Sequence, residues 1–273
     1  MPGPRTRRRW LIGLVVAWII AVAGLAAWSV RRDPATVPEQ RTIAQAVPAL
    51  QRATGAVFAA AGGSGRAVVL GELSFSEECR VTPVRDGLVG ARDVTVYVRT
   101  GEARAGLEAI AAGLPATYRA DVAVSRAGTR FSLHADAGNF IGIDADADAD
   151  AREVTVRAST GCRPDGSGDP APADPAPGPP PAVLEAVLRE LGATSSGPPA
   201  TRAVPCPAGD VAGTYIVDGV SADPTAALRS LGAGASVVRD DDSVRAYRAG
   251  TDSVVVVPDG RRWRLSVSAP CST

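Results

Sequence analysis

An internal repeat constrains the fold of this chain more than any other feature of the sequence. Residues 42–162 and 182–273 each begin with an amphipathic helix pattern, run through an extended segment to a cysteine, and continue with strand and helix patterns. Each stretch closes on a second cysteine, which follows apolar residues at one common spacing: Val154, Val156 and Ala158 before Cys162, and Trp263, Leu265 and Val267 before Cys271. The repeat therefore predicts two copies of one small unit.

Each unit is predicted to be a small domain in which two helices pack on one side of a mostly antiparallel sheet. The helical periodicity places helices at residues 48–63 and 102–114 in the first unit, and at residues 181–192 and 223–232 in the second. Short segments rich in Val and Thr follow the second helix of each unit and indicate strands. The predicted fold class is α+β, with a single N-terminal transmembrane helix before two tandem, related α+β domains.

Two segments of different composition separate these parts. Residues 163–181 are rich in Pro, so they are expected to form an extended, semi-rigid linker that cannot pack. Residues 31–41 form a polar tether before the first domain. With 273 residues, the chain is long enough for an N-terminal segment and two domains that each bury a modest core.

The N-terminal segment has the pattern of a membrane anchor. Residues 10–30 carry no charge, and as a helix they would extend about 31 Å, close to the thickness of a bilayer's hydrocarbon core. Arginines within residues 1–9 precede this run, so the cationic bias predicts a cytoplasmic N-terminus and an extracytoplasmic bulk. The predicted location is the cell membrane, which this helix would contact as a partner. The alternative is a signal peptide that is cleaved near Ala23, which would give a secreted protein.

Cysteine usage also indicates export. All four cysteines lie beyond the N-terminal segment, and an even number in an oxidising compartment favours two disulfides. A zinc or redox site is disfavoured, because no CxxC or Cys/His cluster is present. Of three possible pairings, the repeat selects the one that places a bond inside each unit, which joins Cys79 to Cys162 and Cys206 to Cys271. Closing loops of this length contributes about 4 to 5 kcal/mol in the chain-entropy model.

The sequence IDADADADAR, at residues 143–152, has aspartate at every second position. In the register of the repeat it aligns with a tight turn at residues 258–260, so we interpret it as an elongated hairpin tip at the surface. In strand conformation its carboxylates would share one side of the ribbon, where a divalent cation would relieve their repulsion. A solvated tip is the favoured interpretation, because the glycines of a calcium loop are absent. The weak calcium candidates are Asp144, Asp146, Asp148 and Asp150.

Other candidate chemistry is sparse. The single histidine, His134, falls in a strand pattern and is interpreted as a half-buried or edge residue. No nucleophile elbow, zinc-protease motif or phosphate-binding loop is present, and the chain contains no lysine, so no catalytic residue and no cofactor is predicted. The formal net charge is zero and no basic stripe follows the N-terminal arginines, which argues against a nucleic-acid partner.

The predicted function is therefore non-catalytic. Abundant Ala, Val, Gly and Pro, with arginine in place of lysine, are typical of a GC-rich bacterial genome. We expect a membrane-anchored, extracytoplasmic binding or scaffolding protein of a bacterial cell envelope, with an unidentified envelope protein or ligand as its partner, since duplicated modules suit a binder. The alternative is a cell-envelope hydrolase with an unrecognised carboxylate site, which a pair of acidic residues converging in one cleft would favour.

Overall fold

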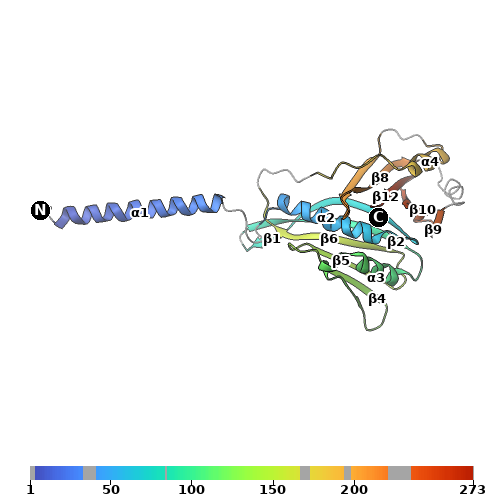
Figure 1. The fold of residues 1–273 in the computed structure, drawn as a ribbon, viewed down its shortest axis with the longest axis horizontal. Coiled ribbons are helices and arrows are strands. Elements are labelled where there is room, and N and C mark those ends of the chain that lie inside the picture. Colours follow the sequence, from blue (N-terminus) through green and yellow to red (C-terminus); the bar gives the residue numbers. More distant parts are fainter. Residues whose placement is uncertain are drawn as a thin grey trace. The chain divides into compact units, whose positions relative to one another are not determined.

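The computed structural model describes residues 4–32, 41–83, 85–166, 173–193, 198–220 and 235–272. The chain divides into two compact units, Met1–Gln40 and Arg41–Thr273. The second unit contains both sheets and the remaining helices, and we call it the body (Figure 1).

In the first unit the described residues form helix α1 (Pro4–Arg32). Among the residues that the structure describes, no helix combines the length and the apolar content needed to cross a membrane. This finding contradicts the predicted transmembrane helix and the predicted single-pass location in the cell membrane.

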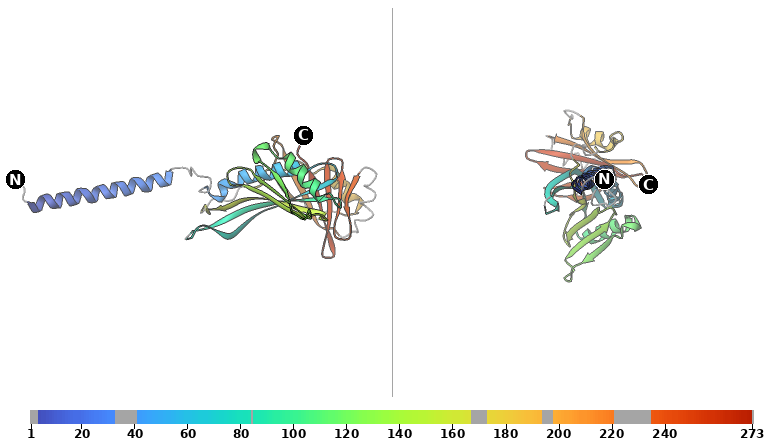
Figure 2. Two further views of the ribbon diagram at one scale, coloured as in Figure 1. Left: turned by 90° about the horizontal axis from the view of Figure 1, so that it is seen from below. Right: turned by 90° about the vertical axis from the view of Figure 1, so that its left-hand side faces the viewer.

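The body contains two six-stranded antiparallel sheets (Figures 1 and 2). Sheet A has the order β1-β2-β6-β5-β4-β3 and is formed by β1 (Arg66–Thr82), β2 (Arg85–Val98), β3 (Asp121–Val124), β4 (Arg130–Asp136), β5 (Gly142–Asp148) and β6 (Glu153–Arg163). Sheet B has the order β7-β8-β12-β11-β10-β9 and is formed by β7 (Ala200–Pro205), β8 (Val211–Val220), β9 (Ala235–Asp240), β10 (Arg245–Ala249), β11 (Asp252–Asp259) and β12 (Arg262–Ala269). The two orders are identical strand for strand, so the sequence repeat is also a repeat of topology.

Among the described residues, the helices of the body are α2 (Ile43–Ala61), α3 (Ala103–Gly113), the one-turn 3₁₀ helix η2 (Ala116–Tyr118) and α4 (Ala182–Glu190). Helix α2 begins before the predicted residue 48 because Thr42 and Gln45 form a capping box. The Gln45 N–H donates to Thr42 Oγ1, and the Thr42 N–H donates to Gln45 Oε1. The helix predicted at residues 223–232 lies outside the described residues.

One hydrophobic core lies between sheet A and its two helices. Helices α2 and α3 cover one face of the sheet, and their fully buried side chains include Leu50, Val57, Leu107 and Ile110 (Figure 2). Successive side chains of a strand point to opposite faces of a sheet, so every second strand residue faces this core. These strand residues include Val94, Val96, Leu133, Ile143, Val154 and Val156.

The two faces of sheet B differ in chemistry. One face is apolar and packs under α4, where Leu184 and Val187 contact a cluster that includes Val217, Val254 and Leu265. The opposite face is mixed. Ala246 and Val255 belong to a buried apolar cluster with Ala67 of β1 and Tyr97 of β2. The same face also carries small hydroxyl side chains that are nevertheless buried, namely Thr214, Ser253, Ser266 and Ser268. Buried hydroxyls need hydrogen-bond partners. The first half of the body supplies one each to Ser253 and Thr214, and the Ser268 hydroxyl pairs with that of Thr214 at 2.7 Å.

Strand β1, an edge strand of sheet A, lies against this hydroxyl-bearing face. The Val68 N–H donates to Ser253 Oγ at 3.0 Å, and the Leu70 N–H donates to Thr214 Oγ1 at 2.9 Å. An exposed edge strand would leave these N–H groups unpaired and open to aggregation. The face of one sheet therefore satisfies the edge of the other.

The two halves also share hydrophobic and ionic contacts. Val204, Cys206 and Ala212, from the second half, belong to the same hydrophobic cluster as α2. Arg152 of the first half donates to the Asp241 carboxylate of the second half at 2.8 Å. The same carboxylate accepts from Arg239. The hydrogen bonds from Arg239, Ser243 and backbone N–H groups lower the pKa of Asp241. The sequence predicts two domains joined by a spacer, whereas the structure has related halves that bury one another's surfaces.

Each half contains one disulfide. Cys79 is joined to Cys162 and Cys206 to Cys271, the pairing that the repeat selects. The bonds close segments of 83 and 65 residues, respectively. Two disulfides fit an extracytoplasmic location, because thiols in the cytosol are kept reduced.

The aspartate repeat is not a hairpin tip. Residues 142–148 form β5, in which Ala145 and Ala147 are buried while the aspartates face solvent. The strand pairs with β4 and, at its first residues, with β6, so the true turn is confined to residues 149–150. The spacing before Cys162 and Cys271 places residues 149–151 opposite residues 258–260, and the structure has a hairpin turn at both places. The error was to extend the tip over Asp144, Asp146 and Asp148, because the period-two alternation of Ala and Asp indicates a half-buried strand.

Candidate binding cleft

The C-terminal part of the Pro-rich segment packs on the body. We call residues 173–181 the strap. The Gln51 side-chain amide donates to Ala173 O at 3.2 Å, and the Tyr215 hydroxyl donates to Gly178 O at 2.7 Å. The strap therefore connects α2 of the first half to β8 of the second, although its composition predicted a spacer without packing.

A buried ion pair fixes the strap between the halves. The Arg92 side chain, from β2, is fully buried and donates to both carboxylate oxygens of Asp174 in the strap, each at 2.8 Å. The same guanidinium donates to Gly71 O in β1 at 3.0 Å and to Ala203 O in β7 at 3.1 Å. Such two-pronged contacts are the strong form of the arginine–carboxylate pair, and this one joins four separate segments.

The ion pair also forms hydrogen bonds with the backbone of β7, an edge strand of sheet B, at a position where a neighbouring strand would otherwise pair. Asp174 Oδ2 accepts from the Ala203 N–H at 3.0 Å, while Arg92 donates to the carbonyl of the same residue. The backbone groups of Ala203 therefore point away from β8. In an antiparallel ladder, every second residue directs its backbone N–H and C=O groups away from the paired strand. The backbone groups of Thr201, two residues before Ala203, therefore also point away from β8, toward the open side of the edge.

Prolines limit this free edge. Pro205 occupies the last outward-facing position of β7, Pro199 directly precedes the strand, and proline has no N–H to donate. The Pro205 carbonyl instead lies directly against Gly55 of α2. Thr201 is therefore the one described residue of this edge that offers both a donor and an acceptor, and a long strand could not be added here.

A β-bulge in β1 forms the facing wall. The register with β2 shifts between Leu70 and Leu73, and Gly71 lies so close to β2 that an added Cβ would be 2.7 Å from Asp93 O. Bulges re-aim the side chains around them. Glu72 is directed into the cleft, and its side chain remains 81% exposed.

Arg202, from β7, is the cation that a ligand could reach. It donates to Leu70 O at 3.3 Å, and its ion pair with Glu72 is long at 3.7 Å. Partial burial lowers the pKa of Arg202, and the negative charge of Glu72 partly offsets this effect by raising it. Its side chain is 31% exposed, so a ligand anion could displace Glu72 and make a shorter contact.

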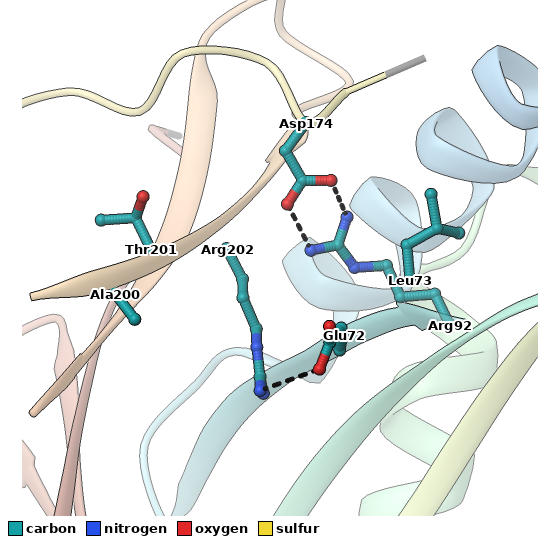
Figure 3. A pocket seen from close by; sticks show the side chains of 7 residues that line it. All are labelled: Glu72, Leu73, Arg92, Asp174, Ala200, Thr201 and Arg202. Carbon is teal, nitrogen blue, oxygen red and sulfur yellow. Dashed lines mark hydrogen bonds and ion pairs between the residues drawn. The ribbon is translucent and has the colours of Figure 1, made fainter. Parts of the chain in front are cut away.

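These groups enclose an open cleft of about 460 Å³. Figure 3 shows Arg92 facing Asp174 on one side, Arg202 facing Glu72 on the other, and Ala200 and Thr201 along β7. The volume is within the range of small-molecule sites. Because β1, β2, the strap and β7 all line it, the cleft exists only where the two halves meet.

Two carboxylates line the cleft, but their arrangement suits binding better than hydrolysis. Both oxygens of Asp174 are occupied by Arg92, and one also accepts from Ala203. Glu72 is highly exposed and faces Arg202. A glycoside hydrolase needs two carboxyl groups that act together on one bond. Here each carboxylate faces its own arginine (Figure 3).

The residues that the sequence singled out lie elsewhere. Asp144, Asp146 and Asp148 form a row on the solvent-exposed face of sheet A, and each has a cross-strand partner: His134 at 2.7 Å, Ser132 at 2.6 Å and Arg130 at 3.4 Å, respectively. Asp150 lies in the following turn. His134 is on this exposed face, with 64% of its side chain accessible, and not half-buried. In the described part of the chain, no three His, Cys, Asp or Glu residues are grouped as metal ligands.

No sequence pattern marks the residues that line the cleft. Arg92, Asp174 and Arg202 belong to no motif, and they meet only through tertiary packing. One signal was present, since the acidic Asp174 is the single residue of the strap, 173–181, that is not Ala, Gly or Pro. Comparisons with models of known protein families, with curated proteins and with solved structures gave no match.

Proposed function

We propose that the protein is an extracytoplasmic binding protein whose cleft between the two halves holds the carboxylate end of a short peptide. The observation that carries the proposal is the unshared pair of backbone groups on Thr201 beside the weakly paired guanidinium of Arg202. A peptide amide would pair with the Thr201 backbone as a strand residue does, and the terminal carboxylate would replace Glu72 on Arg202. The flanking prolines favour a ligand that pairs at only one residue.

The test compares N-acetyl-dialanine with its C-terminal amide by isothermal titration calorimetry. We expect the acid to bind the intact protein about ten-fold more tightly than the amide, a difference of about 1.4 kcal/mol. Arg202→Gln should abolish this difference, because the charge-assisted contact is lost. Glu72→Gln should tighten binding of the acid, because the competing carboxylate is removed while the exposed position leaves the fold unchanged.

Arg130→Gln is the matched control, since this arginine pairs with Asp148 on the exposed face of sheet A, outside the cleft. It should bind both probes like the wild type. Equal affinities of the wild type for acid and amide, or an unchanged preference in Arg202→Gln, would contradict the proposed function.

A further inference from the structure

A second cavity, of about 710 Å³, lies at the C-terminal end of α2. Ala59 and Gly62 form its α2 side, strand β10 contributes Arg248, and the C-terminal segment contributes Pro270 and Cys271. The C-terminal segment is fixed in place by the Cys206–Cys271 disulfide and by the Ser272 N–H, which donates to Asp210 Oδ2 at 2.7 Å. The walls are therefore held by covalent and hydrogen-bonded supports.

Arg248 is the charged residue of this cavity, and the described part of the chain gives it no close counter-ion. Its Nη1 donates to Ser253 Oγ at 3.0 Å, a neutral acceptor. Its Nε is buried and has no hydrogen-bond partner in the described part of the chain. Burial lowers the pKa of Arg248, and no carboxylate among the described residues lies within ion-pair distance, Asp252 acting only from farther away. A buried donor without a partner needs an explanation, and a bound anion provides one.

The neighbouring arginine does not play the same role. Arg66 donates from Nε to Ala61 O at 3.0 Å and from Nη2 to Gly62 O at 2.5 Å. It thereby satisfies carbonyls at the C-terminal end of α2, where the helix dipole favours a cation. Its charge raises the electrostatic potential around Arg248 without supplying a counter-ion.

Apart from Arg248, much of the lining is apolar. Ala59, Pro270 and the disulfide sulfur of Cys271 present carbon and sulfur to the cavity, and Gly62 adds no side chain. Thr251 and Ser272 place hydroxyl groups in the same lining as Arg248. The cavity therefore combines one cationic, hydroxyl-lined region with an apolar remainder.

We infer that this cavity binds an amphipathic carboxylate, a molecule with one anionic end and a short aliphatic body. The carboxylate accepts from the Arg248 guanidinium, and the aliphatic body covers Ala59, Pro270 and the disulfide. The site is separate from the cleft around Arg202 and does not depend on its function. Because both the carboxylate and the aliphatic body of the ligand contact the cavity, we expect that neither the anionic group nor the aliphatic body binds tightly by itself.

The test measures binding of octanoate, octanol and acetate to the intact, oxidised protein by calorimetry. We expect octanoate to bind at least about ten-fold more tightly than either of the other two, which corresponds to about 1.4 kcal/mol. Arg248→Gln should reduce octanoate affinity to that of octanol, and Arg248→Lys should restore part of the difference. Arg202→Gln, in the other site, should bind octanoate like the wild type.

A second variant keeps the inference testable if Arg248→Gln does not fold. Ala59→Leu retains the arginine but fills the apolar part of the cavity, so octanoate binding should be lost while the melting temperature stays near the wild-type value. Equal affinity for octanoate and octanol in the wild type, acetate that binds as tightly as octanoate, or full octanoate binding by Ala59→Leu would each overturn the inference.

Discussion

Replacement of Arg92 by Met is expected to lower the free energy of unfolding by about 3 to 5 kcal/mol, because it breaks a buried ion pair by removing one partner. The Asp174 carboxylate would lose two hydrogen bonds, and the carbonyls of Gly71 and Ala203 would each lose a donor. Asp174 is 28% exposed, so water can solvate it in part, and the lower end of the range is more realistic. Urea unfolding of the oxidised protein measures the change.

Arg130→Met is the matched control for this prediction. Arg130 also pairs with an aspartate, but both side chains are about two-thirds exposed, at 67% and 65%. Such surface pairs contribute about 0 to 1 kcal/mol. A loss of stability in Arg92→Met no larger than in the control would show that the pair does not hold the strap and the halves together.

Replacement of Gly55 by Ala is expected to destabilise the body by about 3 kcal/mol, the upper part of the range for overpacked cores. In an exposed helix the same change would stabilise by about 1 kcal/mol, because Ala is the better helix former. Here a Cβ would be placed 1.9 Å from Pro205 O, which is backbone and cannot move alone. Helix α2 would have to move away from β7, which would open the core that the halves share.

Gly106→Ala in α3 is the comparison variant, since its added Cβ would meet a methyl group of Val98 at 3.2 Å, which a small shift can relieve. Its unfolding free energy should stay within about 1 kcal/mol of the wild type. If Gly55→Ala were as stable as Gly106→Ala, the close approach of α2 to β7 would not exist in solution.

Much of the architecture follows from local sequence patterns. The two closing strands, with matched apolar residues before Cys162 and Cys271, predict the repeat, and the structure shows the same strand order in both sheets. The pairing of the cysteines follows from that repeat. These inferences succeed because strand alternation and cysteine spacing are recorded directly in the sequence.

Relations between distant segments could not be predicted in this way. Thr214 and Ser253 look like ordinary polar positions of half-exposed strands, but their hydroxyls accept from the backbone of β1 and are buried. Arg92 likewise has no local feature that distinguishes it from a surface arginine. Its burial depends on a strap residue 82 positions away in the sequence. Tertiary packing, which no single segment encodes, determines both.

The two related halves form one body, and the cleft between them is a fixed part of it. Differential scanning calorimetry of the oxidised protein tests this most directly. We expect a single unfolding transition for residues 41–273, with the calorimetric enthalpy equal to the van't Hoff enthalpy, because the halves share a core and each satisfies the other's buried polar groups. Two separate transitions, or a calorimetric enthalpy well above the van't Hoff value, would contradict the account.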